Sequence, residues 1–251
     1  MSLAAAVLGP LGQQAAPAAA FNPQTDITWH SLFWAEGSAF QALGLSDTDL
    51  VTTWPNETGE SDATYDSLLT HRPTYEASVT ALGSQPAVTF DGVNDSLKSA
   101  AFSSNPATPY SVVVIGIRTA TGGPGYFTDG ITSSARNIVA SNGSNWGFYA
   151  GTAWIDFAVA HGTAAHLWTV TAIDGSTGSE KGYLDGTLKV TSNAGSHVLT
   201  GITLGAKYDI SANRLTGSIA FAGIYEGDFA ADSNYAAFKT WVASHYGITV
   251  A

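Results

Sequence analysis

Apolar and polar residues follow one another in short runs that are separated by glycine-containing turns. Residues 88–90 (VTF) alternate, which indicates a half-buried strand, and the Asp91-Gly92 dipeptide behind them predicts a tight turn. Residues 110–120 (YSVVVIGIRTA) are β-branched and almost continuously apolar. We therefore expect a central strand that is buried on both faces. Residues 166–174 (HLWTVTAID) alternate again and predict a further strand.

The C-terminal third predicts a hairpin, two more strands and a helix. Residues 181–191 (KGYLDGTLKVT) contain Asp-Gly between two strand-like runs, so we place a hairpin tip there. Beyond residue 231 the apolar spacing changes to a helical period, with Asp232 as N-cap and Gly247 just past the end. One face of this helix carries Tyr235, Phe238, Trp241, Val242 and His245.

Composition agrees with a single all-β domain. The 251 residues include 27 glycines, and many short strands recur at roughly 8–12 residue spacing, which is typical of a sandwich or jelly roll. Nine basic and 20 acidic residues give a net charge of −11. That charge repels nucleic acid and anionic membranes, so we expect neither as a partner. The chain has no cysteine, which excludes disulfides and thiolate metal sites.

The first 20 residues differ from the rest. They are rich in alanine, lack a positively charged start and are interrupted by Pro10 and Pro17, so we expect neither a cleaved signal peptide nor a membrane span. We predict an extended N-terminal assembly arm (1–20) that docks on a neighbouring subunit; packing on its own domain (21–251) is the alternative. Its apolar contact residues would be Leu3, Val7, Leu8 and Leu11.

Three stretches together resemble the LamG-like, concanavalin A-like jelly-roll domains. Residues 72–97 (RPTYEASVTALGSQPAVTFDGVNDSL) are similar to the opening of such domains, residues 166–190 to their "W..V....DG.....Y.DG" hairpin, and residues 213–248 to their C-terminal strand and helix. The three cover about two-thirds of the chain in the right order. The resemblance implies a jelly-roll β-sandwich with a short helix near the C-terminus.

The same resemblance suggests a biological setting. With an uncleaved alanine-rich arm and no enzyme core, the chain is similar to versions encoded by tailed bacteriophages. This implies a non-enzymatic virion structural accessory protein, a minor tail or capsid decoration protein on the exterior of the particle. Its partners would be other virion proteins and sister subunits in a homo-oligomer. The alternative is a carbohydrate-binding module or adhesin that recognises host-surface glycans.

Two groups of residues are candidates for binding. Asp91, Asn94 and Asp95 supply the oxygen ligands that calcium prefers, although a turn in which Asp91 bonds its own backbone fits equally well. Asp129, Asp174 and Asp209 are alternative loop carboxylates with no better spacing. Aromatic platforms with polar neighbours are typical of glycan sites, and burial in the core is the alternative for such aromatics. The candidates are Trp146, Tyr149, Trp154 and Asp156.

Catalysis has little support in the sequence. Glycosidases on this fold place two or three acidic residues along one strand, and no Glu-x-Asp-x-Glu pattern is present. The six histidines show no metal-ligand spacing such as HExxH, and there is no GxSxG motif. We therefore expect a binding or structural protein with no cofactor except the candidate calcium.

Overall fold

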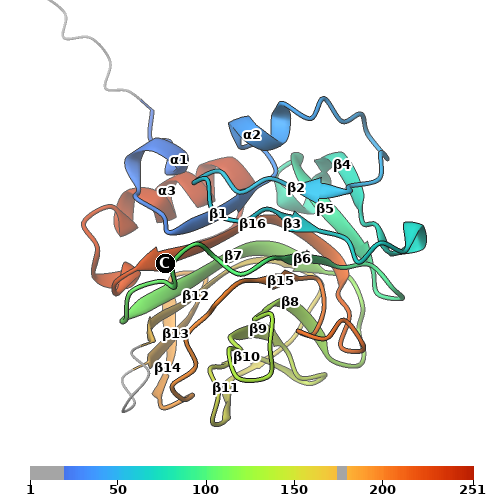
Figure 1. The fold of residues 1–251 in the computed structure, drawn as a ribbon. Coiled ribbons are helices and arrows are strands. Elements are labelled where there is room, and N and C mark those ends of the chain that lie inside the picture. Colours follow the sequence, from blue (N-terminus) through green and yellow to red (C-terminus); the bar gives the residue numbers. More distant parts are fainter. Residues whose placement is uncertain (1–19, 174–179) are drawn as a thin grey trace, which may run out of the picture.

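The computed structural model describes residues 20–173 and 180–251 of the chain. The arm residues Leu3, Val7, Leu8 and Leu11 lie outside the described residues, as does Asp174, so the assembly arm stays a prediction. The described part folds into two antiparallel sheets that face each other, with a helix against the outer side of one of them (Figure 1).

The first sheet, sheet A, has the strand order β14-β13-β12-β7-β16-β5-β4, and β1 also pairs with β16. Its strands span Ser31–Trp34 (β1), Thr74–Val79 (β4), Gln85–Asp91 (β5), Tyr110–Arg118 (β7), Ala165–Ile173 (β12), Glu180–Leu184 (β13), Thr187–Ser192 (β14) and Thr216–Glu226 (β16).

The second sheet, sheet B, has the order β11-β10-β9-β8-β15-β6-β3-β2. Its strands span Thr53–Trp54 (β2), Ala63–Thr64 (β3), Leu97–Ser99 (β6), Gly125–Asp129 (β8), Ile138–Ser141 (β9), Asn145–Tyr149 (β10), Trp154–Ala160 (β11) and Thr203–Leu204 (β15). The helices are short apart from α3: Pro23–Asp26 (α1), Ser38–Gln41 (α2), Leu69–His71 (η1), Thr80–Leu82 (η2), Phe229–Ala231 (η3) and Tyr235–Tyr246 (α3).

Strand β7 lies between two hydrophobic cores, one on each face of sheet A. All nine of its residues are buried, as the continuous apolar run predicts. Val112 and Val114 belong to the core between the sheets, whereas Val113 and Ile115 belong to the core beneath α3. Because side chains alternate along a strand, a strand covered on both faces is buried at every position.

Helix α3 covers the outer face of sheet A. Three residues of the predicted face, Tyr235, Phe238 and Val242, are buried, while Trp241 and His245 are partly buried. Tyr246 is buried as well, and Gly247 ends the helix with φ 68°. The helix begins later than the sequence predicts, because Asn234 holds the N-cap position and Asp232 instead accepts a hydrogen bond from the backbone N–H of Asn234 (2.7 Å). None of the helices in the described ranges has the length and apolar character that crossing a bilayer requires.

The predicted hairpin is confirmed. Strands β13 and β14 pair around Asp185 and Gly186, both with positive φ (51° and 74°), which is the backbone that a two-residue Asp-Gly turn needs. The central expectation of an all-β sandwich with a helix close to the C-terminus is likewise confirmed.

Candidate functional site

An aromatic pair lies on the outer face of sheet B. Strands β10 and β11 are antiparallel neighbours, and their register sets Tyr149 directly opposite Trp154. Trp146 and Phe148, which alternate with Tyr149 along β10, belong to the core between the sheets. Tyr149 and Trp154 therefore point away from the core, and both remain partly exposed.

Gly147 makes room for the indole of Trp154. A Cβ atom at position 147 would lie 2.7 Å from Cζ2 of Trp154 and 2.3 Å from the carbonyl oxygen of Ile155. The indole thus covers the backbone of β10, where any larger residue would displace it. The glycine thus lets the indole pack directly on the backbone of the neighbouring strand.

Arg136, from the loop between β8 and β9, lies beside the aromatic pair. Its Nη2 donates to Oδ2 of Asp129 (2.7 Å), and its Nε lies 3.1 and 3.2 Å from the two carboxylate oxygens. The guanidinium carbon is 5.4 Å from the ring centroid of Tyr149 and 4.9 Å from that of Tyr208, so the cation lies close to two aromatic rings.

Asp129 and His197 hold the β8–β9 loop in place through hydrogen bonds from Arg136. Asp129 is completely buried, and burial raises the pKa of its carboxyl while hydrogen bonds from Arg136 and from the backbone of Tyr208 and Gly130 oppose that rise. Burial and the charge of Arg136 lower the pKa of His197, so its Nδ1 is free to accept from the backbone N–H of Arg136 (3.3 Å). Arg136 is therefore held through both its backbone N–H and its guanidinium.

These residues form an open pocket of about 390 Å³, which we call the aromatic pocket. The pocket combines partly exposed aromatic rings with neutral amide and phenol groups. It is lined by Pro124, Tyr126, Arg136, Ile138, Asn142, Tyr149, Trp154 and Asn213.

Two of the four predicted glycan residues line this pocket, and two do not. Trp146 is a correction: it is fully buried, with its ring centroid 4.9 Å from that of Trp168 in the core between the sheets. Strand β10 carries aromatic residues on both of its faces. The sequence alone therefore does not indicate which of these residues face outward. Asp156 is exposed on β11, where it accepts from Nδ2 of Asn145 (3.0 Å), and it does not line the aromatic pocket.

Sequence reasoning missed Tyr126, Arg136, Asn142 and Asn213. They come from four separate segments, and Asn213 is 87 residues from Tyr126 in the sequence (213 − 126). The backbone contact between them, from the N–H of Tyr126 to the carbonyl of Asn213 (3.1 Å), exists only in the folded chain.

The structure uses the Asp91 loop as a turn. Oδ1 of Asp91 accepts from the backbone N–H groups of Val93 (2.7 Å), Asn94 (3.1 Å) and Asp95 (3.4 Å), and Gly92 has φ 77°. Oδ2 of Asp95 accepts from the N–H of Asp91 (2.9 Å). This matches the turn alternative, in which the carboxylates are already occupied by backbone donors.

No group of three or more histidine, aspartate or glutamate residues in the described part of the chain is arranged to hold a metal ion. The alternative carboxylates also have local partners. Asp129 pairs with Arg136, and Oδ2 of Asp209 accepts from Nζ of Lys207 (2.9 Å). Calcium binding by Asp91, Asn94 and Asp95 stays a prediction.

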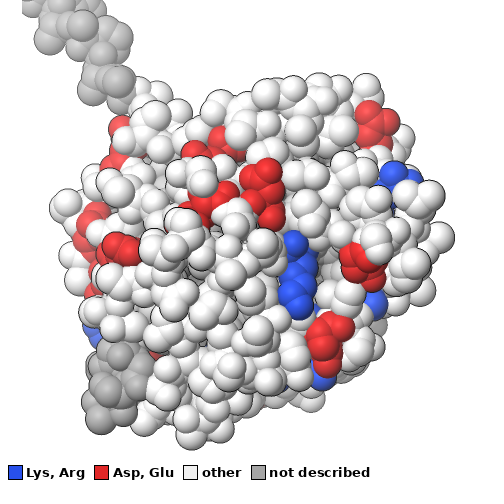
Figure 2. All heavy atoms as spheres, in the orientation of Figure 1, with Lys and Arg blue, Asp and Glu red and all other residues white. Residues whose placement is uncertain are grey.

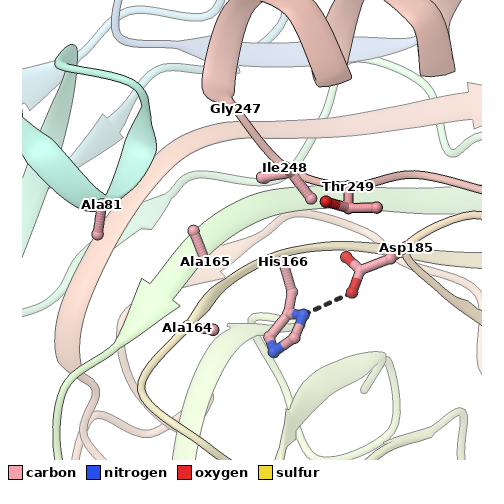
Figure 3. Close-up of a pocket in the computed structure, with 8 residues that line it drawn as sticks. All are labelled: Ala81, Ala164, Ala165, His166, Asp185, Gly247, Ile248 and Thr249. Atoms are coloured by element: carbon pink, nitrogen blue, oxygen red, sulfur yellow. Dashed lines mark hydrogen bonds and ion pairs between the residues drawn. The ribbon is translucent and has the colours of Figure 1, made fainter.

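A second concavity, of about 410 Å³, lies between η2, the start of β12 and the C-terminal segment (Figure 3). His166 and Asp185 are the ionisable residues of its lining, and Nδ1 of His166 lies 2.7 Å from Oδ2 of Asp185. The other oxygen of Asp185 accepts from the N–H of Leu167 (2.9 Å). The pair thus fastens the β13–β14 turn to β12, and small residues without polar side chains make up most of the remaining lining.

Charge is sparse over the surface. Figure 2 shows a mostly uncharged face, on which some acidic groups lie side by side and others lie next to a basic group. Several of the basic groups have acidic partners close by, such as Lys181 with Asp228 (2.9 Å). The aromatic pocket therefore stands out by its rings and amides rather than by a concentration of charge.

Comparison with known proteins gives the fold. No family model matches the chain, and no curated protein matches it. Among solved structures, the sialidase of Trypanosoma rangeli with 2,3-difluorosialic acid is 12% identical with a TM-score of 0.56, over 95% of this chain and 35% of the sialidase. This chain thus spans about a third of the sialidase chain.

Two further structures share the fold. Domain 4 of AbnA, a GH43 extracellular arabinanase from Geobacillus stearothermophilus solved with arabinotriose, is 14% identical with a TM-score of 0.54, over 73% of this chain and 95% of that domain. The binding domain of botulinum neurotoxin serotype D is 12% identical with a TM-score of 0.52, over 76% of this chain and 51% of that chain. With two antiparallel sheets and a C-terminal helix, the chain has the concanavalin A-like β-sandwich fold.

Proposed function

We propose that this chain is a non-catalytic carbohydrate-binding domain that holds a sugar in the aromatic pocket on the outer face of sheet B. The observation that carries the proposal is the fixed pair of Tyr149 and Trp154, which face outward from adjacent strands beside neutral polar groups. The comparison with an arabinanase domain solved with arabinotriose supports the same class of ligand.

The chemistry of the pocket matches that of a sugar. A pyranose or furanose ring has an apolar face of C–H groups, which packs against an aromatic ring, and an edge of hydroxyl groups, which needs hydrogen bonds. Trp154 and Tyr149 supply the rings, while the side chains of Asn142 and Asn213 supply amide donors and acceptors. A pocket that is mostly apolar with a few polar groups is the usual form of a small-molecule site.

The absence of suitable acids argues for binding without hydrolysis. Glycoside hydrolysis needs a pair of carboxyl groups on either side of the bond that is cut. None of the eight residues lining the aromatic pocket is an aspartate or glutamate, and the nearby Asp129 is buried beneath Arg136. The described part of the pocket therefore offers a place for a sugar but no general acid.

The proposal is tested with a glycan array followed by titration of the best ligand, monitored by tryptophan fluorescence. Trp154→Ala and Tyr149→Ala should each weaken binding at least about tenfold, as expected for central aromatic contacts. Val93→Ala, at an exposed position outside the pocket, is the control and should bind as the wild type does. An array that stays blank at high protein concentration would refute the proposal.

A further inference from the structure

Arg136 is the one charged residue among the eight that line the aromatic pocket. In many sites an arginine at this position would receive an anionic group of the ligand, because guanidinium binds carboxylates in a bidentate manner. Whether it can do so here depends on what already occupies its donors.

The donors of Arg136 on one edge are already used. Nε and Nη2 both point at Asp129, with the shortest contact at 2.7 Å. This edge of the guanidinium thus has a carboxylate partner within the protein, and a ligand carboxylate would have to compete with it for a bidentate contact.

Both carboxylate oxygens of Asp129 already accept hydrogen bonds from the protein. Besides Arg136, its Oδ1 accepts from the N–H of Gly130 (2.8 Å) and its Oδ2 from the N–H of Tyr208 (3.0 Å). Its side chain has no exposure to solvent, so the negative charge faces the guanidinium and not the solution. The positive charge of Arg136 is therefore matched inside the protein.

Two aromatic rings also lie close to the guanidinium. The rings of Tyr149 and Tyr208 lie 5.4 and 4.9 Å from its central carbon. Nearby, the ammonium of Lys207 pairs with Asp209 (2.9 Å). An incoming anion would thus find the local cations engaged, in a protein whose net charge is −11.

We infer that the aromatic pocket selects uncharged sugars and discriminates against sugars that carry a carboxylate, because Asp129 already neutralises Arg136. The inference rests on the proposed function and narrows its ligand to neutral glycans. Arg136 then acts as a support for Tyr149 and as a donor to a hydroxyl, not as a receptor for a sugar carboxylate.

The test compares each acidic glycan with its own carboxyl-reduced form, which keeps the backbone and linkages but removes the charge. The wild-type protein should bind the reduced form at least about tenfold more tightly, since a carboxylate that enters the pocket loses hydration without gaining a free cationic partner. Raising the salt concentration should narrow the difference in affinity between the two forms, because salt screens the repulsion between an acidic glycan and the protein's net charge of −11. A wild-type protein that binds acidic forms as well as or better than reduced forms would overturn the inference.

A second experiment uses the variant Asp129→Asn. It leaves Arg136 without a charged partner and should raise the affinity for acidic relative to reduced glycans by about tenfold or more. Asp156→Asn is matched in charge change and lies on the same sheet without touching Arg136, so it should shift that ratio less than about threefold. Equal shifts in both variants would show that overall charge, not the pairing, sets selectivity and would overturn the inference.

The wild-type comparison does not depend on whether Asp129→Asn folds. A failure of the inference also differs from a failure of the proposed function. Preference for acidic forms refutes the inference alone, whereas no binding of either form refutes the proposed function and the inference with it.

Discussion

Tyr149 and Trp154 face each other directly across strands β10 and β11, and Gly147 leaves the space that the indole of Trp154 fills. This relationship sets an aromatic surface on two paired strands of sheet B, with Arg136 of the β8–β9 loop beside Tyr149. Rings held on paired strands lose little freedom on binding, which favours affinity for a ligand that stacks on them.

Gly147→Ala should therefore damage both stability and binding. The new methyl group would overlap the carbonyl oxygen of Ile155, which is backbone and cannot move aside. We expect a loss of about 1–3 kcal/mol in the free energy of unfolding, measured by urea denaturation, together with weaker sugar binding. Gly122→Ala is the matched control, because nothing lies within 4 Å of a Cβ built there. An unchanged midpoint for Gly147→Ala would contradict the geometry.

The ion pair of Arg136 and Asp129 should matter more for stability than the pair of Lys207 and Asp209. Arg136→Gln leaves a fully buried carboxylate without its cation, which should cost on the order of 3 kcal/mol. Lys207→Gln breaks a pair whose side chains keep 25% and 36% exposure and should cost less than about 1 kcal/mol. Thermal or denaturant unfolding of the two variants side by side measures the difference, and equal losses would count against the burial argument.

Asp95 should make stability fall as the pH rises. Burial, with the charge of Asp91 adding to it, raises the pKa of Asp95 to about 6. Since the folded pKa exceeds that of the unfolded chain, the folded protein holds more protons between about pH 4 and 6, and stability drops across that window. Asp95→Asn should therefore have a free energy of unfolding about 1–3 kcal/mol higher than the wild type at pH 7.5, with the difference vanishing near pH 4. Denaturant unfolding at a series of pH values measures it.

Asp209→Asn should show the opposite dependence of stability on pH, because the pKa of Asp209 is lowered whereas that of Asp95 is raised. Slight burial raises the pKa of Asp209, but hydrogen bonds from Lys207 and Ser211 outweigh it and hold that pKa well below its usual range. A carboxyl with a lowered pKa stabilises the fold above its unfolded pKa, so this variant should lose stability at neutral pH and match the wild type in acid. Parallel pH profiles for the two variants would contradict both assignments.

A chelator should leave the melting temperature unchanged. Oδ1 of Asp91 already accepts three backbone N–H groups, so the loop does not need an ion to be ordered. A bound ion would stabilise the folded protein by mass action, so a rise in melting temperature with added calcium would establish the calcium site that the sequence suggests. Asp91→Asn then separates the two cases, because an asparagine oxygen keeps the turn but weakens calcium binding.

Local chemistry in the sequence was enough to predict several elements. The Asp185-Gly186 turn, the doubly buried strand β7 and the end of α3 at Gly247 each depend on short-range rules, and each is confirmed. The start of α3 was predicted less well, because Asp232 and Asn234 can both cap a helix and only the position of η3 decides between them. Virion attachment through residues 1–20 stays a prediction.

The sequence by itself determined that the chain forms many short strands, closes them with glycine turns and ends in an amphipathic helix. Those properties follow from residue periodicity and turn chemistry, which act over a few neighbours. Only the tertiary structure decided that Trp146 faces the core while Tyr149 and Trp154 face outward, and that Arg136 meets Asp129 beside Asn213. Alternation shows which residues share a face of a strand, but which face is covered depends on how distant strands pack.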